Sequence, residues 1–206
     1  MINVLLSTYD FNNEICFNRL RGIIKPDMKV CVIPYSHVNI VYEDEELFNK
    51  MYNFDNGYEL DYIARPYHDY GISREQIRVL NPFRDNKNMM AYKILTSDIL
   101  FFTGGDPVKA MERLEPIRDI LDMFKGIVMG GSAGAMVQVQ EFVMCGEGYS
   151  YSYHNGLGFI KYDLEPIVHF EFEDHIIKLV CRSLRERPQH RLIPLKDGDC
   201  AIFYSE

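Results

Sequence analysis

A serine lies in a turn of small residues at positions 130–135, where the sequence reads GGSAGA. The apolar run 126–129 directly before it predicts a buried strand that enters a sharp turn with Ser132 at its apex. Such a turn strains the serine backbone and lifts the hydroxyl clear of the sheet, where it can act as a nucleophile. The alternative interpretation is a glycine-rich turn that only packs a helix against a sheet.

A second glycine turn, Gly104 and Gly105, follows the apolar run 98–103. Its amide groups can face the serine turn, and we expect the N–H groups of Gly105 and Ala133 to form an oxyanion hole. Asp106 is placed to cap a following helix, so a plain strand-to-helix turn is the alternative here.

A serine hydroxyl is a weak nucleophile that needs a histidine to take its proton and an acid to orient that histidine. His169 follows the apolar run 166–168, which predicts a position at a strand end. The sequence offers six histidines for the role: His37, His68, His154, His169, His175 and His190.

Short apolar runs alternate with longer segments of helical pattern. Strands are expected at residues 2–7, 29–34, 77–80, 98–103, 126–129, 166–170, 191–195 and 200–204. Helices are expected at 12–24, 43–53, 86–96, 107–114, 116–124, from 133 onward, and at 173–186. Residues 58–82 are otherwise expected to be irregular, and residues 143–153 to form a loop or hairpin.

This alternation indicates one α/β domain over residues 1–206, with a mostly parallel sheet covered by helices on both faces in three layers. Sites in such folds lie at the carboxyl ends of the strands. Both glycine-rich turns follow a strand, so we expect them to meet at one edge of the sheet.

The charge, the cysteine content and the lengths of the apolar runs argue against nucleic-acid and membrane partners. The formal net charge is −8, from 22 basic and 30 acidic residues, and the basic residues are scattered, which argues against nucleic-acid binding. Five cysteines without a C-x-x-C motif indicate reduced thiols in a cytoplasmic protein. No apolar run is long enough for a membrane span, and the first residues lack the pattern of a signal peptide.

Residues 102–106, FTGGD, together with GGSAGA at 130–135, resemble peptidase E (aspartyl dipeptidase) and its relatives, including cyanophycinase. The resemblance extends over most of the chain. It implies the glutamine-amidotransferase-like (flavodoxin-like) α/β fold and a serine peptidase that hydrolyses small peptides without a metal or other cofactor.

The resemblance also implies roles for single residues. His169 followed by Phe170 fits the histidine–aromatic motif of the family, which makes His169 the general base. Glu147 stands at the offset where peptidase E has its aspartate, and Glu141 is the nearby alternative for the third member of the triad.

Two departures from the family bear on the substrate. Asp106 stands where the family commonly has asparagine. The stretch 170–175 is acidic where peptidase E is thought to grip its aspartyl substrate with an arginine, and Arg182 and Arg185 come later on the expected helix. We therefore expect a free amino terminus or a basic residue to be favoured over an aspartyl side chain.

Candidate substrate-binding residues are Gly104, Asp106 and Tyr151, the last in an alternating Tyr/Ser run that forms either a hairpin or a pocket wall. The run HFEFEDH at 169–175 contains metal-ligand types, but a helix starting near residue 173 would break its alternation. Solvated acids at a helix N-terminus are the preferred interpretation, so no metal site is expected.

The preferred function is therefore a serine peptidase acting on small peptides through Ser132, His169 and Glu147. One alternative keeps the fold and acts on a cyanophycin-like or other unusual peptide, or on an ester. Another is a binding module that retains the fold without catalysis. Neither a nucleic-acid nor a membrane partner is expected, and a homodimer is left open.

Overall fold

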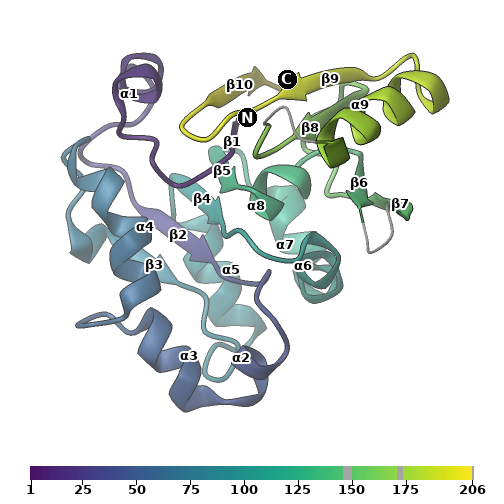
Figure 1. The fold of residues 1–206 in the computed structure, drawn as a ribbon. Helices are drawn as coiled ribbons and strands as arrows, with labels where there is room; N and C mark the ends of the chain where they lie inside the picture. Colours follow the sequence, from purple (N-terminus) through teal and green to yellow (C-terminus); the bar gives the residue numbers. More distant parts are fainter. Residues whose placement is uncertain (146–149, 171–173, 206) are drawn as a thin grey trace.

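The computed structural model describes residues 1–145, 150–170 and 174–205. A six-stranded sheet with the order β10-β1-β5-β4-β2-β3 forms its centre (Figure 1). Strand β10 pairs with β1 in antiparallel orientation, and the other neighbouring pairs are parallel. The strands are β1 (Ile2–Leu6), β2 (Val30–Ile33), β3 (Ile77–Val79), β4 (Ile99–Phe102), β5 (Ile127–Gly131) and β10 (Cys200–Tyr204). The expectation of a mostly parallel sheet is confirmed.

Helices cover both faces of this sheet because its central strands are apolar on both sides. In β4, Ile99 and Phe101 pack into one core, while Leu100 and Phe102 pack into the other. The first core is closed by α1 (Glu14–Leu20), α2 (Ile40–Glu43), α3 (Glu45–Tyr52) and α4 (Tyr58–His68). The second is closed by α5 (Lys87–Leu95), α6 (Pro107–Leu114), the 3-10 turn η2 (Glu115–Ile117) and α7 (Arg118–Met123).

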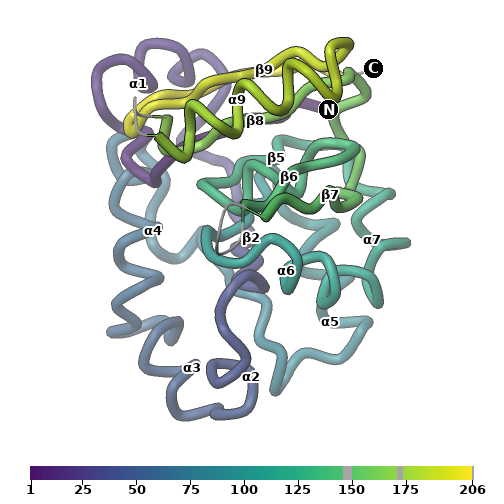
Figure 2. Tube along the Cα trace, turned by 45° about the vertical axis from the view of Figure 1, so that its right-hand side comes forward, coloured from purple at the N-terminus to yellow at the C-terminus, as the bar shows by residue number. Residues whose placement is uncertain are grey.

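Two small sheets complete the fold. Strand β6 (Glu141–Cys145) pairs antiparallel with β7 (Tyr151–Asn155), and β8 (Leu164–Ile167) pairs parallel with β9 (Arg191–Pro194). Figure 2 shows β8, β9 and α9 (Asp174–Glu186) running together along one side of the molecule. A third apolar cluster joins these sheets to the short helix α8 (Ala133–Met136) and to β1: Leu5, Ala135, Val139, Phe142, Ile160, Leu164 and Leu195.

Residues 58–68 differ from the sequence expectation, because they form α4 instead of an irregular segment. Leu60, Ile63, Ala64 and Tyr67 follow helical spacing and bury one face of the helix. Pro66 lies inside α4, where it removes one backbone hydrogen bond, and it obscures the helical pattern in the sequence. The strand expected nearby is present as β3, after the 3-10 turn η1 (Arg74–Gln76).

The turn after β5 depends on close approach of backbone to backbone. A Cβ atom on Gly134 would lie 2.1 Å from the carbonyl oxygen of Phe102, and one on Gly130 would lie 2.2 Å from the carbonyl oxygen of Gly134. Helix α8 therefore packs onto β4 and β5 through atoms that leave no room for a side chain. This contact explains why small residues surround Ser132.

We expect Gly134→Ala to lower the free energy of unfolding by about 2 kcal/mol or more, because the added methyl overlaps a backbone carbonyl. Gly22→Ala is the matched control, since nothing lies within 4 Å of the corresponding Cβ position. The control should change stability by no more than about 1 kcal/mol. Urea unfolding of the two variants measures the difference, and equal stabilities would contradict the packing described.

Candidate active site

Ser132 follows β5 directly and adopts φ 52° and ψ −116°. Its N–H donates to the carbonyl oxygen of Leu6, at 3.0 Å, at the end of the neighbouring strand β1. A positive φ at a residue other than glycine costs on the order of 1–3 kcal/mol and persists only where the surroundings enforce it. The strained serine turn expected from the sequence is thus present.

The backbone around His169 is held by the β8–β9 pair, whose hydrogen bonds continue past β8. Leu195 N–H donates to the carbonyl oxygen of Ile167, and Phe170 N–H donates to that of Leu195, each at 2.9 Å. His169 lies between these two bonds with φ 51°, again in the left-handed region. This bend brings its ring toward the serine turn.

The ring of His169 joins two side chains. Its Nε2 lies 3.1 Å from Ser132 Oγ, and its Nδ1 lies 2.8 Å from Asp197 Oδ1. A neutral imidazole whose Nδ1–H donates to a carboxylate leaves Nε2 free to accept the serine proton. The three side chains form one continuous chain of hydrogen bonds.

The carboxylate on His169 differs from the one assigned by sequence. Glu141 instead forms an ion pair with Arg187 at 2.5 Å, and Glu147 lies outside the described residues. Asp197 lies in the turn between β9 and β10, in the short stretch between the two strands expected at 191–195 and 200–204. The sequence did place Asp197 just beyond the end of an expected strand. It did not show that this strand pairs with the strand before His169.

Hydrogen bonds hold the pKa of Asp197 below its usual range, the first from the Ser7 hydroxyl and the next from His169. The Ser7 bond is 2.7 Å long. The side chains of His169 and Asp197 are 50% and 57% exposed, so the acid–base pair lies at an open edge that a substrate can reach.

The glycine loop after β4 lies against the serine turn. A Cβ atom on Gly104 would lie 3.3 Å from Ser132 Cβ, which places the two turns in contact. Gly105 has φ 139°, and a Cβ there would lie 2.4 Å from the carbonyl oxygen of Ser36. The loop therefore requires glycine at this position.

The amide groups of these turns differ in their availability. Gly104 N–H donates to the hydroxyl of Tyr9. Among the described residues Gly105 N–H has no acceptor, and Ala133 N–H, in the first position of α8, has none within its helix. Two amides at the ends of neighbouring strands are thus free to bind an oxyanion.

The remaining candidates lie as follows. The Asp106 carboxylate accepts from the N–H groups of Val108 and Lys109, at 2.8 and 3.1 Å, and so caps α6. Tyr151 lies on β7 with the guanidinium of Arg182 4.6 Å from its ring centroid. It lines a cavity of about 350 Å³ with Lys178, Cys181, Arg182 and Arg185.

The described part of the chain contains no cluster of three or more His, Cys, Asp or Glu side chains arranged for a metal ion. Glu171 and Glu173, which the sequence offered as metal-ligand types, fall outside the described residues.

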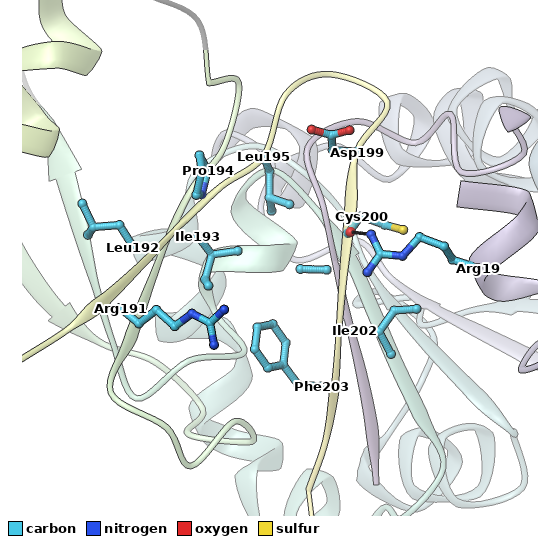
Figure 3. Close-up of a pocket in the computed structure, with 11 residues that line it drawn as sticks. Arg19, Arg191, Leu192, Ile193, Pro194, Leu195, Asp199, Cys200, Ile202 and Phe203 are labelled. Atoms are coloured by element: carbon cyan, nitrogen blue, oxygen red, sulfur yellow. Dashed lines mark hydrogen bonds between the residues drawn. The ribbon is translucent and has the colours of Figure 1, made fainter. Parts of the chain in front are cut away.

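A cavity of about 630 Å³ lies between β9 and β10, and Figure 3 shows Arg19, Arg191 and Phe203 around it. Its lining does not include Ser132 or His169. None of the described helices is both long and apolar enough to span a bilayer.

The family model of peptidase family S51 matches residues 20–206. The chain belongs to peptidase family S51. This membership makes it a serine-type peptidase, in agreement with the site geometry. No curated protein sequence matches the chain.

Among the solved structures that share the fold are two peptidases. One, provisionally assigned as a peptidase E protein of Listeria monocytogenes EGD-e, is 14% identical with a TM-score of 0.63, over 98% of this chain and 93% of the other. The other, a peptidase from an acI-B1 actinobacterium, is 16% identical with a TM-score of 0.66, over 98% and 82%. At these identities the likeness establishes the architecture alone.

The lowered pKa of Asp197 predicts a pH dependence of stability. The unfolded aspartate has a pKa of about 3.9, so Asp197 stabilises the folded state fully above that pH. The contribution is lost as the pH falls through the lower pKa of the folded state. The difference in unfolding free energy between the native chain and Asp197→Asn should therefore shrink as the pH falls below about 4. Denaturant unfolding across the acid range measures it, and a difference that grows below about pH 4 would contradict the assignment.

Proposed function

We propose that the chain hydrolyses small peptides through a Ser132–His169–Asp197 triad. The observation that carries the proposal is the continuous hydrogen-bond chain, with 3.1 Å between Ser132 Oγ and His169 Nε2 and 2.8 Å between His169 Nδ1 and Asp197. Asp197 takes the role that the sequence analysis gave to Glu147.

In the reaction, Ser132 Oγ attacks the scissile carbonyl carbon while His169 Nε2 accepts the hydroxyl proton. Asp197 stabilises the imidazolium through Nδ1–H without taking its proton. His169 then donates its Nε2 proton to the leaving amine as the C–N bond breaks. Water hydrolyses the resulting acyl-enzyme, with His169 as base again.

The negative charge that develops on the carbonyl oxygen requires preorganised donors. The proposal assigns this role to the N–H groups of Gly105 and Ala133. The contact between Gly104 and Ser132 supports it, because it brings the two loops to the same reacting carbon.

Acidic groups near the triad support a preference for a free amino terminus or a basic residue. The ring of Tyr62 packs against Tyr9 with centroids 5.4 Å apart, and Tyr9 in turn covers Gly131 and Gly104. Burial is the main cause of the raised pKa of Tyr62. The charges of Asp10, Glu59 and Asp197 raise this pKa further, while Arg65 lowers it, so acidic charge outweighs basic charge in this region. An aspartyl side chain would meet repulsion here.

Of the substrate-binding candidates, Gly104 lies closest to the chemistry and is proposed to approach the substrate backbone. Asp106 is proposed to brace the loop as the helix cap, since its carboxylate already accepts two N–H groups. That Tyr151 binds the substrate stays a prediction.

The test is hydrolysis of a panel of di- and tripeptides that vary the N-terminal residue, with Ser132→Ala in parallel. We expect cleavage to fall by about 10³-fold or more in the variant, which keeps the fold. Peptides with a basic or neutral N-terminal residue should be cleaved faster than aspartyl peptides. Residual turnover within tenfold of the native chain would refute Ser132 as the nucleophile, and hydrolysis of esters alone would indicate the alternative substrate class.

A further inference from the structure

Ser7 is a fully buried polar residue next to the proposed triad. It directly follows β1, whose last residue, Leu6, is opposite Gly131 on one side and Cys200 on the other. This register places Ser7 between the serine turn after β5 and the Asp197 turn before β10. Both turns thus converge on Ser7, at the carboxyl end of β1.

The Ser7 hydroxyl joins the backbone of His169 to the side chain of Asp197. It accepts from the His169 backbone N–H at 2.8 Å and lies 2.7 Å from Asp197 Oδ1. A hydroxyl has one proton to donate, and an ionised carboxylate can only accept. The proton of Ser7 is therefore directed to Asp197, and His169 Nδ1, 3.4 Å from Ser7 Oγ, keeps its own proton for the same carboxylate.

The Ser7 hydroxyl limits the movement of the Asp197 carboxylate and of the His169 backbone. Asp197 Oδ1 accepts from Ser7 and from His169 at once, although more than half of the Asp197 side chain is exposed to water. Without a donor on its buried side, the carboxylate could rotate toward solvent. The same hydroxyl satisfies the backbone N–H of His169, which is held at a positive φ.

The main chain of the Asp197 turn has separate supports. Gly198 N–H donates to Thr8 Oγ1 at 3.3 Å, and its carbonyl oxygen accepts from Asn13 Nδ2 at 2.8 Å and from Cys16 Sγ at 3.1 Å. Removing the Ser7 hydroxyl should therefore leave the turn in place. Its effect falls on the Asp197 carboxylate and on the His169 backbone.

We propose that Ser7 is a positioning residue that binds the acid and the base of the triad into one unit and so keeps His169 Nε2 directed at Ser132. The inference rests on the proposed function, because it assumes that His169 activates Ser132. Ser7 acts through these neighbours and does not touch the reacting atoms.

The test compares Ser7→Ala and Ser7→Cys with the native chain. Cysteine is close to serine in size but is a weak hydrogen-bond donor, so it separates packing from hydrogen bonding. Ser97→Ala is the control, because Ser97 is also buried and bonds through its hydroxyl to the Lys93 carbonyl oxygen, outside the site. The main measurement is the rate at which a fluorophosphonate probe labels Ser132, which requires no knowledge of the peptide substrate.

We expect both Ser7 variants to be labelled about 10- to 100-fold more slowly than the native chain, as for other small misplacements of catalytic groups. NMR titration should show the pKa of Asp197 rising toward its usual value in both variants. The Ser97→Ala variant should keep the native labelling rate and the native Asp197 titration, even if it unfolds more easily.

Labelling of Ser7→Ala within threefold of the native rate, in folded protein, would overturn the role of Ser7. So would an unchanged Asp197 titration. Failure of the proposed function is distinguishable, because the native chain itself would then neither react with the probe at Ser132 nor cleave peptides.

Discussion

The pairing of β10 with β1 is the constraint on which the site depends. Its register sets Cys200 opposite Leu6, so the preceding turn must lie over the carboxyl end of β1. The chain reaches that turn from β9, which pairs with β8 and thereby also sets the position of His169. One turn between two sheets therefore supplies the carboxylate. A slip of one residue in either pairing would turn Asp197 away from the imidazole.

Backbone strain is concentrated where the chemistry is expected. Ser132 and His169 are the residues other than glycine with positive φ in the described structure. Both are held by hydrogen bonds to the carboxyl end of β1, from Ser132 N–H to the Leu6 carbonyl and from His169 N–H to the hydroxyl of Ser7, the residue after the strand. The segment from Asn3 to Ser7 is buried and thus supports both strained residues.

The sequence permits prediction of the elements whose signals are local. Continuous apolar runs mark β2, β4 and β5, because strands buried on both faces need no polar positions. Small residues surround Ser132 because backbone atoms pack closely there, and His169 follows the end of a strand. Both positions could therefore be proposed from the sequence. Helix α4 was missed because Pro66 and the surrounding tyrosines obscure its apolar face.

The carboxylate could not be predicted in the same way. Strands were correctly expected at residues 191–195 and 200–204, but periodicity does not tell which strand each one pairs with. Asp197 meets His169 only because β9 pairs with β8 while β10 pairs with β1. An acid chosen by its offset from Ser132 ignores these long-range pairings, and Glu141 in fact binds Arg187.

The most direct test of the triad is NMR of the chain labelled with ¹⁵N-histidine, with the His169 signals assigned through His169→Gln. The account predicts that neutral His169 carries its proton on Nδ1, with a downfield resonance typical of a hydrogen bond to a carboxylate. That resonance should be lost in Asp197→Asn and retained in Glu141→Gln and Glu147→Gln. A proton on Nε2, or an Nδ1 resonance that survives Asp197→Asn and disappears in Glu147→Gln, would contradict the account.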